Sequence, residues 1–274
     1  MNEDDKFIDI DKVIHSKNPK LLKWLPKFIL RYIKRIVHED EINQILLENK
    51  DNYGYDFCNK IINRFSIKVT TKGTKNIPKD GGYIFVANHP LGGMDAVAIV
   101  TAVAPIRNDI KFVVNDLLLN FKNLKGLFVG VNKYGGNSKE SLIMVDELFA
   151  SDNAVFIFPA GLVSRRNRGK VEDLEWKKSF ITRAKRHNKT IIPLYVEGNL
   201  TNFFYRLSNY RTKIGIKANI EMFYLVDEFF KQESKHLKII FGEPVLSSLF
   251  DKSKTDKEWA EWMKKKVYSL KSNC

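Results

Sequence analysis

The sequence predicts an α/β protein in which a mainly parallel sheet is flanked by helices, preceded by an N-terminal helical segment. From residue 65 onward, short apolar runs alternate with helical stretches. Two of these apolar runs end in turns that contain glycine and chemically active side chains. The first 64 residues instead show only helical periodicity. We therefore expect a helical segment over residues 1–64 and an α/β domain over residues 65–274.

The bulk composition supports a globular protein with anionic partners. The chain has 274 residues, of which 44% are hydrophobic, and its net charge is +14. Such a charge favours nucleic acid, anionic lipid or an acidic carrier protein. Because no helix-turn-helix, zinc-finger or aromatic-basic RNA motif is present, we expect no nucleic-acid partner. The two cysteines, Cys58 and Cys274, make no disulfide scaffold and favour a reduced, cytoplasmic protein.

The N-terminal segment predicts three helices, over residues 19–37, 39–49 and 53–63. In the first, five basic residues recur at spacings of three and four, and apolar residues including Trp24 and Phe28 fill the other faces. The basic residues are Lys20, Lys23, Lys27, Arg31 and Lys34. Pro26 either kinks this helix or starts its second half. The helix fits an amphipathic anchor in an anionic lipid interface. The alternative is a helix that packs on the α/β domain with its basic face in water.

The remainder of the chain alternates strands and helices. We expect strands over residues 67–71, 83–87, 111–115, 127–131, 154–158, 191–196, 216–223 and 237–241. We expect helices over residues 95–103, 117–123, 139–150, 175–188, 200–207 and 257–270. Open parallel sheets place their sites at the carboxyl ends of strands, so the residues that follow each strand matter most for function.

The first chemically informative strand end is the run that follows residues 83–87, Asn88-His89-Pro90-Leu91-Gly92-Gly93-Met94-Asp95. An imidazole is suited to remove a proton from an alcohol near neutral pH. It needs a carboxylate that fixes its tautomer, and Asp95 lies across a tight turn. The alternative role for Asp95 is to cap the following helix.

The second such strand end follows residues 154–158. Pro159-Ala160-Gly161 leads into a basic cluster that contains Arg165, Arg166, Arg168 and Lys170. Guanidinium groups in such a loop bind phosphate or carboxylate. The alternative is a solvated basic loop.

Together the two strand ends resemble the glycerol-3-phosphate and lysophospholipid acyltransferase family. That family carries an Asn-His-(x)4-Asp block and, further on, a Phe-Pro-Glu-Gly-Thr-Arg-Ser block, which resemble residues 88–95 and 158–165 here. Residues 126–132 stand in the place of its Gly-x-x-Phe-x-x-Arg block, and residues 192–194 in that of its Val-Pro-Val block. The four matches occur in order over residues 65–198.

The resemblance implies His89 and Asp95 as catalytic residues and direct acyl transfer, with oxyanion donors among the backbone N–H groups near Gly161 or Gly92. It implies a substrate-binding set of Asn88, Gly92, Gly93, Lys133, Phe158, Pro159, Gly161, Ser164, Arg165 and Arg166. Five residues instead of four separate His89 from Asp95, and Ala160 replaces the glutamate of the family. These departures resemble the hemolysin-like branch, which is linked to bacterial ornithine and glycine lipids. We therefore expect a lyso-aminolipid acceptor, with a 1-acyl-glycerol-3-phosphate acyltransferase and a non-catalytic lipid-binding module as alternatives.

The expected partners follow from this resemblance. The acyl donor is a thioester of acyl carrier protein or coenzyme A, and no bound cofactor is expected. No metal site is expected, because the five histidines form no His-x-x-x-His pair. The acidic N-terminus does not resemble a secretory signal, and no run of about 18 apolar residues predicts a membrane span. We expect a peripheral protein on the cytoplasmic face of the inner membrane.

Overall fold

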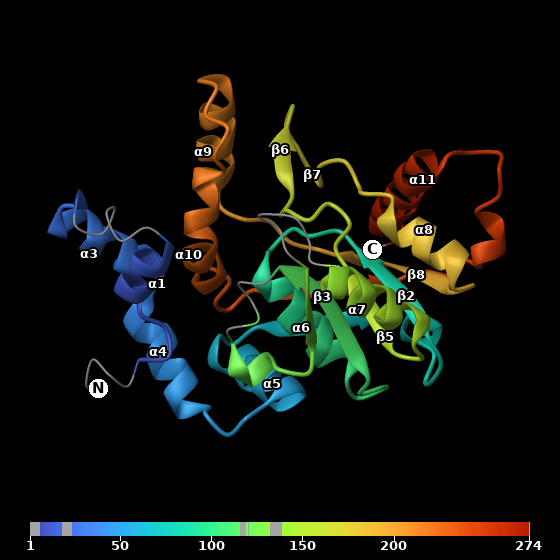
Figure 1. Cartoon of the computed structure of the whole chain (residues 1–274), viewed down its shortest axis with the longest axis horizontal. Helices are drawn as coiled ribbons and strands as arrows, with labels where there is room; N and C mark the ends of the chain where they lie inside the picture. Colours follow the sequence, from blue (N-terminus) through green and yellow to red (C-terminus); the bar gives the residue numbers. More distant parts are fainter. Residues whose placement is uncertain (1–5, 18–23, 116–118, 120, 132–138, 274) are drawn as a thin grey trace. The chain divides into compact units, whose positions relative to one another are not determined.

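The computed structural model describes residues 6–17, 24–115, 119, 121–131 and 139–273, and its chain separates into two compact units (Figure 1). The first unit comprises Met1–Asn52 and Thr201–Lys231, and the second comprises Tyr53–Leu200 and Gln232–Cys274. This division differs from the expected boundary after residue 64. Helix α5 (Gly54–Arg64) belongs to the second unit, where its buried residues pack against helix α6. Residues 201–231, far along the chain, complete the first unit.

The first unit is helical. It contains α1 (Ile10–Lys17), α3 (Lys27–Ile36), α4 (Glu39–Glu48), α9 (Asn202–Lys213), η5 (Ile220–Tyr224) and α10 (Leu225–Phe230). His38 joins its two chain segments, because the imidazole contacts the Asp227 carboxylate at 3.1 Å and stacks on Phe230 at 4.0 Å. The hydroxyls of Tyr32 and Tyr224 are 2.7 Å apart. These long-range contacts explain why residues 201–231 pack with the N-terminal helices.

The basic helix expected over residues 19–37 is present from Lys27 to Ile36, directly after Pro26. Pro26 therefore starts the second half of the pattern, as a proline suited to a helix N-terminus does. Residues 18–23, which include Lys20 and Lys23, lie outside the described residues. None of the helices in the described ranges has the length and hydropathy needed to span a bilayer.

The strand expected over residues 216–223 is wrong. Helix α9 instead continues to Lys213, Gly215 takes a left-handed conformation (φ 78°), and a 3-10 turn follows. The buried Glu221 carboxylate pairs with Arg211 on α9 at 2.8 Å. This ion pair holds the segment against α9. The alternation of apolar and polar residues over 216–223 resembles that of a strand, but this local pattern does not include the tertiary contact, which prevails here.

The second unit is built on a seven-stranded sheet with strand order β1-β9-β8-β2-β5-β3-β4. The strands are β1 (Lys68–Lys72), β2 (Tyr83–Ala87), β3 (Ile110–Asn115), β4 (Phe128–Val131), β5 (Ala154–Ile157), β8 (Thr190–Val196) and β9 (His236–Phe241). All neighbouring pairs are parallel except β8 and β9. The expected mainly parallel sheet flanked by helices is therefore confirmed.

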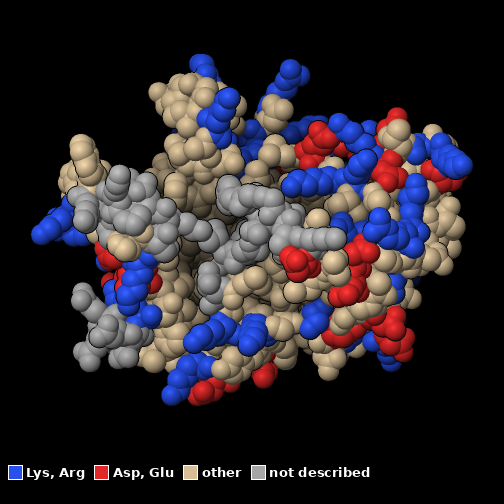
Figure 2. Space-filling view, in the orientation of Figure 1, with Lys and Arg blue, Asp and Glu red and all other residues tan. Residues whose placement is uncertain are grey.

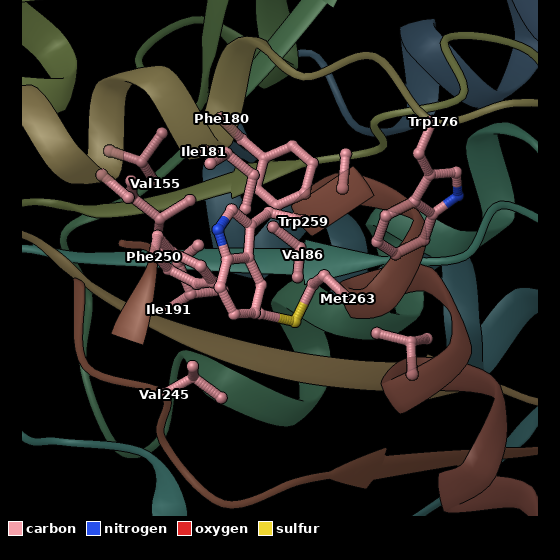
Figure 3. Close-up of a cluster of buried hydrophobic side chains, with 14 of the residues drawn as sticks. Val86, Val155, Trp176, Phe180, Ile181, Ile191, Val245, Phe250, Trp259 and Met263 are labelled. Carbon is pink, nitrogen blue, oxygen red and sulfur yellow. The ribbon is translucent and has the colours of Figure 1, made fainter. Parts of the chain in front are cut away.

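Helices α7 (Lys139–Ala150), α8 (Ser179–Arg186) and α11 (Asp256–Ser269) bury one face of this sheet. Ile84 and Val86 of β2 face this core, where Phe180, Trp259 and Met263 fill the space between the helices and the strands (Figure 3). Successive side chains of a strand point to opposite faces, so Phe85 lies on the other side, stacked on Phe156 of β5 at 4.3 Å. Both faces of the central strands are thus buried, as continuous apolar runs predict.

Two helical expectations for this unit need correction. Helix α8 begins at Ser179 instead of 175, because residues 173–178 form an irregular segment whose side chains contact the candidate site. Of the helix expected over residues 117–123, residues 117, 118 and 120 lie outside the described residues, and Lys122–Leu124 forms a 3-10 turn. Helix α6 (Gly93–Val103) and the short antiparallel pair β6 (Arg165–Asn167) and β7 (Lys170–Glu172) complete the elements near the site.

Candidate active site

The two sequence blocks meet because their strands are neighbours. Strand β2 ends immediately before Asn88, strand β5 ends immediately before Phe158, and the two strands pair in parallel with Val86 opposite Ile157. Their carboxyl ends therefore lie at the same edge of the sheet, where open α/β folds place ligands. The described residues of the candidate site all belong to the second unit.

His89 and Asp95 contact each other directly. The Nδ1 atom of His89 lies 2.8 Å from the Asp95 carboxylate, so the imidazole donates from Nδ1 and Nε2 is the nitrogen that can accept a proton. The imidazole is partly exposed, at 18%, whereas the Asp95 side chain is fully buried. The extra residue between the two is accommodated, because Gly92 takes φ 70° and ψ −131°, a conformation that residues with a side chain rarely adopt. A non-catalytic module with the two side chains out of reach of each other is not supported.

Asp95 is held in place by its own helix. It lies in the first turn of α6, and the carboxylate oxygen that binds His89 also accepts a hydrogen bond from the Leu91 N–H at 3.0 Å. Gly92, and not Asp95, is the N-cap residue. Burial raises the pKa of Asp95, and the hydrogen bond from His89 opposes that rise. A carboxylate that is buried beside an imidazole stabilises the imidazolium strongly, because little water screens the pair.

Phe158 contributes the wall next to the imidazole. Its ring stacks on that of His89 with centroids 4.1 Å apart and planes 18° from parallel. Directly after it, Pro159 and Gly161 form a turn in which the Gly161 N–H donates to the Phe158 carbonyl at 2.9 Å. That N–H is therefore already used by the turn, and the expected source of oxyanion donors stays a prediction.

Asp173 is a site residue that the sequence reasoning missed. Its buried carboxylate accepts hydrogen bonds from the His89 main-chain N–H at 3.1 Å, the Ser164 hydroxyl at 2.5 Å and the Trp176 indole N–H at 2.9 Å. The Ser164 N–H in turn donates to the His89 carbonyl at 2.8 Å. These bonds join the loop after β2 to the loop after β5 and fix the position of His89. The Ser164 hydroxyl is part of this connection, and its expected role in binding substrate stays a prediction.

The C-terminal helix supports the same network. The Tyr268 hydroxyl accepts the Asp173 main-chain N–H at 2.7 Å, and the Lys264 ammonium donates to the Asp173 carbonyl at 2.7 Å. Burial and the nearby Asp173 carboxylate raise the pKa of Tyr268, so its hydroxyl stays protonated. No motif of the sequence marks Asp173, because its partners come from four separate stretches of the chain.

Removal of the Asp173 carboxylate is expected to destabilise the protein and abolish activity. Asp173→Ala leaves three buried donors without an acceptor, which costs about 3 kcal/mol or more. A loss of that size lowers Tm by about 6 °C or more in a chain of this length. Thermal unfolding followed by circular dichroism measures the shift, with Glu172→Ala as an exposed neighbouring control. A Tm within about 1 °C of wild type would show that the network contributes little.

Arg165 and Arg166 lie in strand β6, whose hairpin with β7 was not expected from the sequence. Arg165 is buried, and its guanidinium donates to the Val163 carbonyl at 2.7 Å. Arg165 therefore holds the loop after Gly161. Its expected role in binding substrate stays a prediction, and the hydrogen bond to Val163 does not favour it, because it occupies part of the guanidinium. Arg166 is half-buried.

Four residues of the expected substrate-binding set remain, namely Asn88, Gly93, Pro159 and Lys133. The Asn88 amide donates to the Val196 carbonyl at 2.8 Å and accepts the Val196 N–H at 2.7 Å, so it ties the end of β2 to β8. Gly93 starts α6 and is exposed, and Pro159 is buried. Lys133 lies outside the described residues.

Two further observations concern metal ligands and thiols in the described ranges. These ranges contain no group of three or more His, Cys, Asp or Glu side chains that could hold a metal ion. Cys58 is buried, and burial raises the pKa of its thiol to about 12, so the reactive thiolate does not form near neutral pH. The imidazole–carboxylate pair is thus the group in the site best suited to activate a hydroxyl.

A family model described as "Acyltransferase" matches residues 12–274. The chain is 45% identical over 272 residues to the lyso-glycine lipid O-acyltransferase of Bacteroides thetaiotaomicron, covering 98% of this chain and 100% of that protein. It is 42% identical over 272 residues to the protein of the same name from Phocaeicola vulgatus, covering 98% of each chain. Among solved structures, it is similar to the 1-acyl-sn-glycerophosphate acyltransferase of Thermotoga maritima, with 18% identity, coverage of 89% and 92%, and a TM-score of 0.48.

Proposed function

The chain belongs to the acyltransferase family, and on that premise we propose that it esterifies the hydroxyl of a lyso-aminolipid with a fatty acyl group from a thioester donor. The observation that carries the chemistry is the Asp95-held imidazole of His89 at the shared end of β2 and β5. The resemblance of the four sequence blocks to an acyltransferase family is confirmed by the family match and by the two relatives.

The proposed reaction is a single displacement at a carbonyl. The Nε2 atom of His89 takes the proton of the acceptor hydroxyl while its oxygen attacks the thioester carbon. Asp95 stabilises the imidazolium that forms. The C–S bond then breaks, the ester forms, and the leaving thiolate takes the proton back from Nε2. The donor thiol is that of acyl carrier protein or coenzyme A.

The acceptor class is supported by similarity to the two lyso-glycine lipid O-acyltransferases, which cover nearly the whole chain. It is also supported by Ala160, which replaces the family's glutamate, and by a buried Arg165 bound to main-chain carbonyls. Both features make a glycerol-phosphate head group a weaker candidate for the acceptor. We therefore propose an N-acylated amino acid, of the lyso-glycine type, as the acceptor.

An acceptor assay tests this proposal. Purified protein is given radiolabelled acyl-acyl carrier protein or acyl-coenzyme A together with lyso-glycine lipid, lyso-ornithine lipid or 1-acyl-glycerol-3-phosphate. We expect the diacylated product from lyso-glycine lipid at a rate at least tenfold above that from 1-acyl-glycerol-3-phosphate, since a site built for one polar head group rejects another strongly. Preference for the glycerol-phosphate acceptor would contradict the proposal and establish a phospholipid-type enzyme.

We also propose that the first unit docks on an anionic membrane on the cytoplasmic side. Helix α3 follows Trp24, which is 88% exposed, and itself carries Phe28, which is 66% exposed. Lys27 and Arg31 are exposed on the same helix. Aromatic and basic residues that are exposed together fit a lipid interface. Lys and Arg also cover more of the visible surface than Asp and Glu do (Figure 2).

Charge reversal tests the anchor. Changing Lys20, Lys23, Lys27 and Arg31 together to Glu is expected to release the protein from anionic vesicles, because each basic residue near such a surface contributes about 1 kcal/mol. Vesicle flotation measures the bound fraction, and binding by wild type is expected to fall with added salt. The control reverses four exposed lysines of the second unit, Lys60, Lys79, Lys125 and Lys252. Equal flotation of both variants, each folded by circular dichroism, would exclude this helix as the anchor.

A further inference from the structure

Lys177 lies over the turn that forms one wall of the candidate site. Its main-chain N–H donates to the Pro159 carbonyl at 3.0 Å, which fixes the residue beside the end of β5. A Cβ atom placed on Gly161 would lie 3.6 Å from the Lys177 Nζ atom. The ammonium group is therefore close to the turn that begins with Phe158, the residue whose ring stacks on His89.

The charges around the site leave this ammonium as a candidate for binding an anion. Asp95 and Asp173 place two buried carboxylates behind His89. Two described cations near them are already engaged, because Arg165 donates to the Val163 carbonyl and Lys264 to the Asp173 carbonyl. Lys177 is exposed and forms no ion pair with any side chain in the described ranges.

An amino acid acylated on its nitrogen is an anion, because the amide removes the ammonium charge and the carboxylate remains. Such a head group would be repelled by the carboxylates of the site unless a cation compensates. A lysine ammonium offers a point charge and three donors to a carboxylate. We infer that Lys177 binds the free carboxylate of the acceptor and so selects an acidic head group. This inference rests on the proposed function.

The experiment compares two proteins, each with two acceptors. Wild type and Lys177→Ala are assayed with an N-(3-hydroxyacyl)glycine and with its methyl ester, which differs by the loss of the negative charge. We expect wild type to prefer the acid by about tenfold in kcat/KM. This factor is at the lower end of the effects of a hydrogen bond between charged groups, because the site is partly exposed. Lys177→Ala is expected to lose this preference through a higher KM for the acid, with its activity on the ester unchanged. Lys177→Arg is expected to keep it.

Lys178→Ala is the matched control. Lys178 is the adjacent residue and is also exposed, but it interacts electrostatically with Asp256 on α11. We expect it to keep the wild-type preference for the acid. If Lys177→Ala keeps that preference, or loses activity on acid and ester equally, the inference is wrong. A raised KM for the thioester donor alone would also overturn it, because Lys177 would then serve the donor. Failure of wild type on both acceptors, with activity on 1-acyl-glycerol-3-phosphate, would instead overturn the proposed function.

Discussion

Replacement of His89 by alanine is expected to lower turnover at least about 100-fold, because general-base catalysis contributes roughly 10²–10⁴-fold. The imidazole is partly exposed and lies after the end of strand β2, outside the hydrophobic core. Its main-chain N–H and C=O groups, which bind Asp173 and Ser164, are retained in the variant. Initial rates with the lyso-glycine lipid acceptor measure the loss, and the Tm is expected to stay close to that of wild type.

His15→Ala provides the matched control, because it removes an exposed imidazole from helix α1 in the first unit. It is expected to leave turnover unchanged. If His89→Ala retains more than about a tenth of wild-type turnover, the general-base role is wrong, since the expected contribution is at least ten times larger than that.

Replacement of Asp95 by asparagine is expected to separate activity from stability. The amide keeps the size of the side chain but no longer stabilises an imidazolium, and it favours the wrong tautomer of His89. We expect turnover to fall about 100-fold or more. The fold should not weaken near neutral pH, because burial raises the pKa of Asp95 and the ionised carboxylate is therefore unfavourable in the folded state.

Protonation of Asp95 is linked to folding, because its pKa differs between the folded and unfolded states. A carboxyl group whose pKa is higher in the folded state than in the unfolded state loses stabilising free energy as pH rises through these values. Wild type is therefore expected to lose stability relative to Asp95→Asn from the unfolded pKa of about 4 upward. Tm values of both proteins across that range measure the difference, with Asp80→Asn as an exposed control. A large Tm loss in Asp95→Asn at neutral pH would show that the carboxylate is mainly structural.

The candidate site was only partly predictable. The sequence indicated His89 and Asp95, because an imidazole and a carboxylate across a glycine turn are recognisable from local order alone. It did not indicate Asp173 or Lys177. Lys177 lies in the segment 175–188 that was expected to be helical, and Asp173 lies just before that segment. It also favoured Arg165 as an anion-binding residue, whereas the guanidinium is bound to main-chain carbonyls of its own loop. Which atoms a side chain contacts depends on neighbours that are distant in the sequence.

The sequence by itself determined the α/β class, the strands that carry the two blocks and the acyltransferase family, because apolar periodicity and short motifs are local properties. Tertiary structure decided the rest. The parallel pairing of β2 with β5 brings the blocks together, and Asp173 locks their loops. Where a strand was expected, the Arg211–Glu221 ion pair holds a 3-10 turn against the longer helix α9. Residues 201–231 joined the N-terminal helices through contacts such as His38 with Asp227. Each outcome rests on an interaction between residues that are separated along the chain, and local sequence patterns do not register such interactions. Buried groups such as Asp173 and Glu221 depend on them most, because an unpaired polar group in the interior is costly.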